Sequence, residues 1–216
     1  MNLTIFGASG RTGRELVRQA LARSHHVTAV VRRPDDFAPR HDNLAIFRGD
    51  IVNLDDVAAA IDGRHAVVSA LGPHTLLRRV AALTAGIRNI VRAMEAVGVG
   101  RLVYTSALGV GDSLDDQNAF FRYVLCPVLL GRDYADHLAN EEIIKSSALD
   151  WTIARPARLT DGPRTGNYEV RERLPATFPL GRISRADVAD FLLNELEHPA
   201  HLRHTPGLLG FKSLWA

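Results

Sequence analysis

Three glycines near the start of the chain constrain its fold more than any other feature. The apolar run Leu3–Phe6 is followed by the segment GASGRTG, which contains Gly7, Gly10 and Gly13, and then by the helix-type run Arg14–Arg23. Residues without a side chain allow a sharp turn out of a strand and a close approach between backbone segments. The pattern therefore predicts a strand, a tight turn and a helix packed closely against that strand.

The same loop is suited to bind a phosphate group. Backbone N–H groups in the first turn of a helix lack partners within the helix, and the helix dipole adds a partial positive charge there. Gly10 would let these groups approach the pyrophosphate of a dinucleotide, because no Cβ atom stands in the way. The spacing Gly-x-x-Gly-x-x-Gly differs from the Gly-x-Gly-x-x-Gly of many dehydrogenases, but its place between a strand and a helix favours nucleotide binding. A tight structural turn without a ligand is the alternative.

Strand-type and helix-type segments alternate along the rest of the chain. The expected strands are brief, apolar and rich in branched residues: Leu3–Phe6, Val27–Val31, Leu44–Phe47, Ala66–Ala70, Leu102–Thr105 and Trp151–Ala154. The expected helices are Arg14–Arg23, Leu54–Ile61 after the N-cap Asn53, Leu83–Val97, Tyr134–Ser147, and a last helix opened by Ser184 with Asp187 as its capping-box partner. This order predicts a single α/β domain over residues 1–216, a Rossmann-type doubly wound parallel sheet with helices on both faces.

Two loops are expected to build a substrate region above the carboxyl ends of the strands, where such sheets bind ligands. They lie around residues 107–135 and 155–181, and the second has four prolines and reads as extended loop. The apolar segment Phe120–Leu130 within the first is interpreted as a lid, a self-association surface or ordinary core.

Composition limits the possible partners. A net charge of +2, with the basic residues spread along the chain, argues against nucleic acid. No apolar run approaches the roughly 20 residues of a membrane helix, so no membrane association is expected. The single cysteine, Cys126, excludes an internal disulfide and a thiolate metal cluster, and a reducing, cytoplasmic location without a metal site is expected.

The end of the second strand indicates which dinucleotide binds. Where an acidic residue would contact the ribose of NAD, the chain has Arg32 and Arg33. A guanidinium grips a 2′-phosphate through paired hydrogen bonds, and Arg11 in the glycine loop adds to this clamp. The sequence therefore favours NADP(H), while Asp35 and Asp36 keep NAD open.

Three segments together resemble a known family. With GASGRTG, RNIVRAMEAVGVGRLVYTSALGV and SALDWTIARPARLTDGPRTGNYEV, the chain resembles the atypical short-chain dehydrogenase/reductases of the biliverdin reductase B (flavin reductase) group, from Leu3 to about Leu196. The resemblance implies a single Rossmann domain, with NADPH across the carboxyl edge of the sheet. It also implies hydride transfer to flat conjugated molecules such as flavins and tetrapyrroles.

The resemblance assigns cofactor contacts in four places. The phosphate loop of the family matches Gly7, Ser9, Gly10, Arg11, Thr12 and Gly13, and its 2′-phosphate site matches Arg32 and Arg33. Its adenine-side contacts match Asp50 and Ile51, and the residues beside the nicotinamide ribose match Leu71 and Gly72. Ser106 matches a serine by the nicotinamide, and His137 matches another residue on the cofactor side.

The same resemblance suggests two candidate catalytic residues. Ser106 is expected to orient the nicotinamide or relay a proton, and Arg158 to stabilise negative charge or hold a substrate carboxylate. The plainer alternative for Ser106 is a strand-end hydroxyl that binds local backbone groups, and for Arg158 it is a surface ion pair. Tyr104 and Arg158 replace a cysteine and a histidine of the mammalian member, and the Tyr-x-x-x-Lys pair of the superfamily is absent.

The sequence thus predicts an NADPH-dependent reductase of a small-molecule flavin, tetrapyrrole or quinone-like acceptor. A non-catalytic NADP-binding redox sensor that regulates a partner protein is the main alternative. A sugar-nucleotide isomerase or dehydratase is disfavoured by the missing Tyr and Lys pair. The physiological substrate and the oligomeric state stay open.

Overall fold

The computed structural model describes residues 1–72, 80–114, 123, 131–174 and 181–210. The elements of these residues are, in chain order, β1 (Asn2–Phe6), α1 (Arg11–Ala22), β2 (His26–Val31), η1 (Pro34–Asp36), β3 (Leu44–Arg48), α2 (Leu54–Ile61), β4 (Ala66–Ser69), α3 (Val80–Val97), β5 (Arg101–Thr105), η2 (Gly111–Leu114), α4 (Gly131–Lys145), β6 (Asp150–Pro156), β7 (Arg158–Thr160), β8 (Tyr168–Arg171), β9 (Arg182–Ser184), α5 (Arg185–Glu197) and β10 (Gly207–Gly210).

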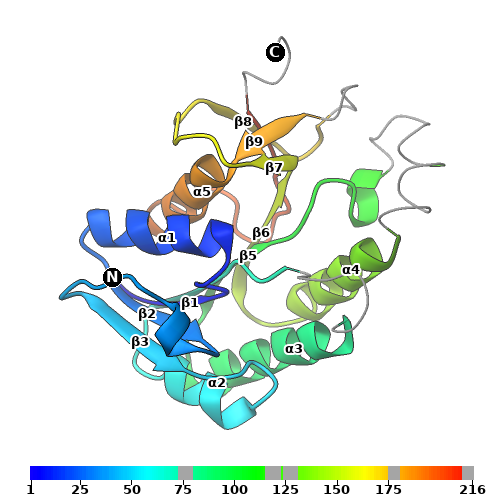
Figure 1. The fold of residues 1–216 in the computed structure, drawn as a ribbon. Helices are drawn as coiled ribbons and strands as arrows, with labels where there is room; N and C mark the ends of the chain where they lie inside the picture. The colour runs from blue at the N-terminus through cyan, green and yellow to red at the C-terminus, as the bar shows by residue number, and fades with distance from the viewer. Residues whose placement is uncertain (73–79, 115–122, 124–130, 175–180, 211–216) are drawn as a thin grey trace.

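A central sheet of eight strands organises the molecule (Figure 1). Its order is β3-β2-β1-β4-β5-β6-β10-β8, and every neighbouring pair is parallel except β10 with the edge strand β8. From β1 the chain adds β2 and β3 on one side, and it then adds β4, β5 and β6 on the other side. Doubly wound sheets bind nucleotides at such a switch point, here between β1 and β4. Strands β7 and β9 form a separate parallel pair.

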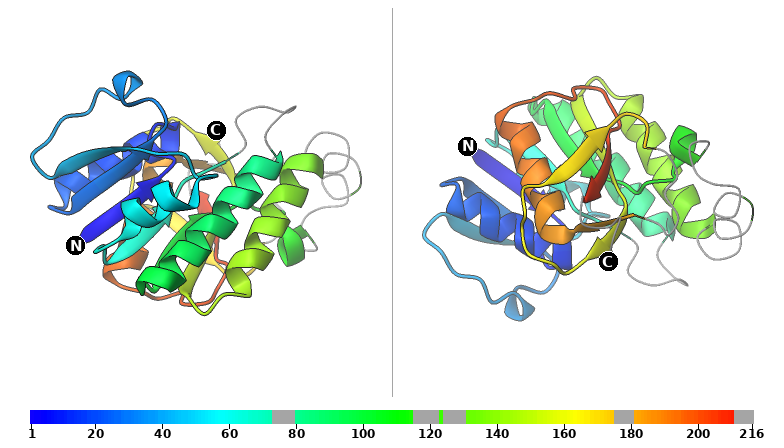
Figure 2. Two further views of the ribbon diagram at one scale, coloured as in Figure 1. Left: turned by 90° about the horizontal axis from the view of Figure 1, so that it is seen from below. Right: turned by 90° about the horizontal axis from the view of Figure 1, so that it is seen from above.

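Helices cover both faces of this sheet. Helices α1 and α5 pack together on one face, and α2, α3 and α4 form a layer on the other (Figure 2). The strands supply both cores because their side chains alternate: Leu3 and Ile5 belong to the core under α1 and α5, while Phe6 belongs to the core under α2 and α3. The Rossmann-type fold expected from the sequence is confirmed.

The helix starts follow the expected capping residues. The Asn53 side chain accepts a hydrogen bond from the Asp55 N–H at 3.0 Å and begins α2. The Ser184 hydroxyl accepts one from the Asp187 N–H at 2.9 Å and begins α5. Of the described helices, none combines the length and the apolar character needed to cross a bilayer.

The expectation of an unpaired loop over residues 155–181 is wrong in part. That segment contains β7, which pairs with β9, and β8, which pairs with β10. Strand β10 was not expected, because a run of Gly-Leu-Leu-Gly carries no strand signal of its own. These short strands form through contacts between distant parts of the chain, which local sequence patterns do not record.

Candidate cofactor and acceptor site

The glycine loop has the geometry that its spacing predicts. Gly7 has a φ of +79°, and a Cβ atom there would lie 2.7 Å from the Ala70 carbonyl oxygen of the neighbouring strand's end. A Cβ atom on Gly13 would overlap the Gly7 carbonyl oxygen. Gly10 is the N-cap of α1 without a side-chain cap, and the first turn of α1 contains no acidic residue. The N–H groups of this turn are therefore available to an anion.

Arginines surround the glycine loop. Arg11 forms an exposed ion pair with Asp161 at 3.0 Å, and the other oxygen of Asp161 lies 2.6 Å from Arg185 at the start of α5. The Nε of Arg14 donates to the carbonyl of Ser9 at 3.0 Å and so braces the loop. The half-buried Thr12 lies in the first turn of α1.

The second strand ends in the expected arginine pair. Arg32 and Arg33 are both exposed. The Nε of Arg33 lies 2.9 Å from a carboxylate oxygen of Asp36, which ends the short helix η1. The side chains of this pair are 83% and 62% exposed, so a phosphate would displace the carboxylate at little cost.

The expected adenine-side and ribose-side residues follow β3 and β4. The Asp50 N–H donates to the Asp56 carboxylate at 3.0 Å, and an Asp50 oxygen accepts from the Val52 N–H at 3.2 Å. Ile51 packs against Gly86 of α3, where an added Cβ atom would overlap it. Leu71 and Gly72 are half-buried residues just after β4, and a Cβ atom on Gly72 would meet nothing within 4 Å. This open backbone is compatible with a bound ligand.

A buried charged network lies where β5 and β6 end. The Ser106 hydroxyl, directly after β5, donates to the Glu141 carboxylate at 2.7 Å. Arg155 of β6 donates to both oxygens of Glu141, from Nε at 3.0 Å and from Nη2 at 2.6 Å. Lys145 lies 3.0 Å from Glu141, and Asp112 lies 2.8 Å from Arg155. The Ser106 hydroxyl is thus bonded to a carboxylate and not to local backbone groups.

The ionisation of this network is set by opposing effects. Burial disfavours the Glu141 carboxylate, but the hydrogen bonds and charge of Arg155, with smaller contributions from Ser106 and Lys145, hold the pKa of Glu141 below its usual value. Burial likewise disfavours the charged form of Arg155, but Glu141 and Asp112 raise its pKa. Both groups are therefore ionised at neutral pH.

Tyr104 and His137 lie beside this network. Tyr104 is fully buried in β5, its hydroxyl accepts from the Asn140 amide at 3.2 Å, and the same oxygen is 3.4 Å from Nδ1 of His137. Burial raises the pKa of Tyr104. The Asn140 hydrogen bond opposes this shift and the Glu141 charge adds to it, both to a smaller extent. His137, Asn140 and Glu141 are three and four residues apart, so one face of α4 supplies all three.

Arg158 lies on the separate two-stranded sheet, and it has an arginine neighbour. It is the register partner of Arg182 in β9, and both side chains are exposed. Register partners of parallel strands point to the same face, and like charges so placed repel each other. Within the described ranges neither side chain has a carboxylate partner, so this pair presents positive charge.

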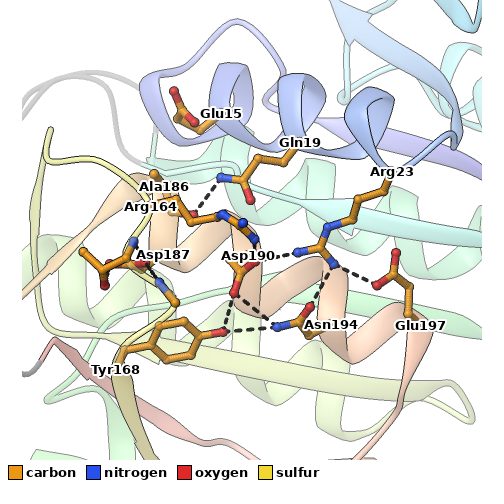
Figure 3. Close-up of polar contacts among 12 residues, drawn as sticks. Glu15, Gln19, Arg23, Arg164, Tyr168, Ala186, Asp187, Asp190, Asn194 and Glu197 are labelled. Carbon is orange, nitrogen blue, oxygen red and sulfur yellow. Dashed lines mark hydrogen bonds and ion pairs between the residues drawn. The ribbon is translucent and has the colours of Figure 1, made fainter.

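Helix α5 anchors the loop that leads from β7 to β8 (Figure 3). Asp187 accepts hydrogen bonds from the Thr165 N–H at 2.6 Å and the Gly166 N–H at 2.9 Å. Asp190 accepts from Arg164 at 2.8 Å and from the Tyr168 hydroxyl at 3.0 Å. Asp190 thereby holds both ends of residues 164–168, and Asp187 holds the backbone between them.

Sequence reasoning missed Glu141, Arg155 and Arg182. Arg155 had a signal, because it is the one charged residue inside the apolar strand segment WTIARPA. Glu141 had a weaker one, since it follows His137 by one helical turn. Arg182 had none, because its relation to Arg158 arises from strand pairing. The segment Phe120–Leu130, interpreted as a lid, an association surface or core, lies outside the described residues apart from Tyr123.

The strand order and the glycine loop define a class, the Rossmann-type nucleotide-binding proteins. A family described as NAD(P)H-binding matches residues 7–199. The chain therefore belongs to this NAD(P)H-binding family, as the resemblance implied.

Individual relatives agree with this assignment. The YwnB protein of Bacillus subtilis is 30% identical over 210 residues, which are 93% of this chain and 94% of that protein. Cinnamoyl-CoA reductase 1 of Oryza sativa is 26% identical over 181 residues, covering 74% of this chain and 53% of that protein. The structure of ChuY, an anaerobillin reductase of Escherichia coli O157:H7, has a TM-score of 0.83 with 24% identity over 100% of both chains. This last likeness concerns the fold.

Proposed function

We propose that this protein is an NADPH-dependent reductase that transfers hydride to a flat conjugated acceptor bearing a negative group. Family membership supports a nicotinamide cofactor, and the bare first turn of α1 supports phosphate binding there. When bound, the cofactor supplies the hydride. The chain's own residues orient the two reactants and neutralise charge.

The cofactor residues are proposed as the sequence predicts them. The glycine loop, with Ser9, Arg11 and Thr12, holds the pyrophosphate. Asp50 and Ile51 contact the adenine side, and Leu71 and Gly72 lie beside the nicotinamide ribose. Arg32 and Arg33 hold the 2′-phosphate, which favours NADP over NAD. His137 is a further residue on the cofactor side.

The acceptor region is proposed to consist of the loops around residues 107–135 and 155–181. The observation that carries this part is the Arg158 and Arg182 register pair. The Ser106 N–H donates to the Ala154 carbonyl at 2.8 Å, so Arg158 is only four residues, at most about 13 Å of extended chain, from the point beside Ser106. Arginine side chains at that position are suited to hold a phosphate or carboxylate of an acceptor stacked near Ser106.

One observation favours the alternative role of an NADP-binding redox sensor. The proton of Ser106 is bonded to Glu141, and the Tyr104 hydroxyl is fully buried with a raised pKa, so neither is suited to protonate a product. A reductase of a conjugated acceptor does not need such a donor, because the charge that forms is delocalised and solvent supplies the proton. Positioning then supplies much of the rate.

Anaerobic stopped-flow measurements with NADPH and FMN test the proposal. A reductase oxidises NADPH with loss of the flavin absorbance, and Ser106→Ala and Arg158→Ala slow this reaction. Tight NADPH binding without turnover across flavins, tetrapyrroles and quinones would instead identify the sensor.

A further inference from the structure

We infer that Ser106 serves the nicotinamide only as a hydrogen-bond acceptor, and that Glu141 and Arg155 are positioning residues that impose this polarity. The inference rests on the proposed function, because it concerns the cofactor's carboxamide. It decides between the two roles that the sequence left open for Ser106, orienting the cofactor and relaying a proton.

The first step concerns the direction of one hydrogen bond. Ser106 is 5% exposed, and its hydroxyl lies 2.7 Å from Glu141. An ionised carboxylate has no proton to give, so it accepts only. Because Arg155 and Lys145 surround it with positive charge, Glu141 is ionised and the serine hydroxyl must donate.

The second step follows from the valence of a hydroxyl group. A serine hydroxyl has one proton and two lone pairs. With its proton engaged by Glu141, the oxygen of Ser106 retains only acceptor capacity towards a ligand. A nicotinamide carboxamide offers an NH2 group and a carbonyl group, and only the NH2 group forms a hydrogen bond with such an oxygen. The network would therefore select one of the two carboxamide orientations and exclude proton relay by Ser106.

The third step concerns why the network is built from charges. The side chains of Arg155 and Glu141 are 1% and 0% exposed, and burying such a pair has a large desolvation cost. Replacing a buried ion pair with apolar residues is often neutral or stabilising, so stability alone is a weak reason for this pair. An arginine that contacts both carboxylate oxygens fixes the carboxylate plane, and hence the oxygen that Ser106 meets.

Two cofactors that differ in one group test this polarity. The acetylpyridine analogue of NADP+ has a methyl group in place of the carboxamide NH2 and keeps the carbonyl. We expect Ser106→Ala to weaken NADP+ binding about three- to tenfold in calorimetric titrations, and analogue binding less than about twofold. An equal loss for both would show that Ser106 donates to the shared carbonyl, and no loss for either would show that it does not touch the carboxamide; both outcomes overturn the inference.

A second variant tests the positioning residues. In Glu141→Gln, two fixed donors, Arg155 Nη2 and Lys145 Nζ, point to the place of Oε2, at 2.6 Å and 3.0 Å. Only one fixed donor, Arg155 Nε, points to the place of Oε1, because the Ser106 hydroxyl can turn. The amide oxygen is therefore favoured on the Oε2 side. The amide NH2 would then face Ser106 and reverse its polarity. We expect the ratio of analogue Kd to NADP+ Kd to fall towards one, whereas a merely structural role would weaken both ligands in parallel and leave the ratio unchanged. That parallel loss would overturn the role of Glu141.

Controls separate this inference from the proposed function and from misfolding. Ser147→Ala removes a hydroxyl just beyond the C-terminal end of α4, which donates to the Ile144 carbonyl at 2.6 Å. This variant should leave the affinities for NADP+ and for the analogue unchanged. Thermal melting checks that the Ser106→Ala protein is folded. We expect it to fold, because the substitution removes a single hydroxyl group. If the wild-type protein binds neither cofactor, the proposed function and the inference both fail; if it binds both and Ser106→Ala gives equal losses, only the inference fails.

Discussion

The Arg33 guanidinium lies 2.9 Å from the Asp36 carboxylate on the exposed turn after β2. This exposed ion pair is weak, and it engages the guanidinium that we assign to the 2′-phosphate. On binding, the phosphate would take the place of the Asp36 carboxylate. We expect Arg33→Ala to weaken NADPH binding about tenfold and to leave NADH binding unchanged. Asp36→Asn should strengthen NADPH binding because it removes the competing carboxylate.

Fluorescence titrations with the two cofactors check this selectivity. Arg18→Ala is the matched control, since Arg18 forms a similar exposed pair with Glu15 at 2.8 Å on α1. Equal losses of NADPH and NADH in Arg33→Ala would refute the assignment of this arginine.

Gly13→Ala should damage the cofactor loop. Its Cβ atom would overlap the Gly7 carbonyl oxygen, so α1 must move away from β1. We expect a loss of several kcal/mol of unfolding free energy, or of detectable cofactor binding, because backbone is the clashing group. Gly100→Ala is the control, since an added Cβ atom there meets nothing within 4 Å. Urea titration compares the two, and a Gly13→Ala protein as stable and as competent in binding as Gly100→Ala would contradict the loop geometry.

Asp190→Ala should destabilise the α1 and α5 layer. This carboxylate is 5% exposed and lies 2.6 Å from Arg23 and 2.8 Å from Arg164 (Figure 3). Removing it takes one partner from the partly buried Arg23 and from the half-buried Tyr168 hydroxyl, at a cost of about 2 kcal/mol, or roughly 4–8 °C in Tm. The exposed pair of Glu15 and Arg18 gives a control, since Glu15→Ala should cost less than about 1 kcal/mol. Calorimetry measures both, and equal small shifts would show that the network contributes little.

Tyr104→Phe should reduce the loss of stability in alkali. Burial raises the pKa of Tyr104 above its usual 10.0, so the phenol stays neutral in the folded chain after it has ionised in the unfolded chain. Its contribution is complete below about pH 10 and is lost as the pH rises further, by at most about 1.4 kcal/mol per pH unit. The variant should lose about 1 kcal/mol of unfolding free energy at neutral pH, because Asn140 loses a hydrogen-bond partner. Above about pH 10, its unfolding free energy should fall less steeply with pH than that of the wild-type protein.

Urea midpoints between about pH 8 and about pH 11 check this slope. Tyr123→Phe is the control, because the Tyr123 side chain is 69% exposed. Tyr168 also has a pKa raised by burial and Asp190, so a residual slope is expected in the variant. An alkaline limb as steep as that of the wild-type protein would contradict the burial of Tyr104 in β5.

The regular part of the fold was predictable because its signals are local. The strand from Leu3 to Phe6, the glycine spacing, and the caps Asn53 and Ser184 each act within a few residues. The pairing of β8 with β10 joins residues about 40 positions apart, Tyr168 with Gly210, and no local pattern records it. The proposed single domain with two substrate loops stays a prediction, as does the cytoplasmic location.

The sequence by itself determined the Rossmann-type sheet and the glycine loop, because periodicity, glycine conformation and helix capping are properties of neighbouring residues. Only the tertiary structure decided that Glu141 of α4 meets Arg155 of β6 and accepts a hydrogen bond from Ser106, and that Arg158 is the register partner of Arg182. Packing of a helix on a sheet and pairing of strands bring these side chains together, and a hydrogen bond or a like-charge pair is defined by distance in space. The local signals specify the scaffold, and the long-range contacts specify the polarity and charge of its proposed site.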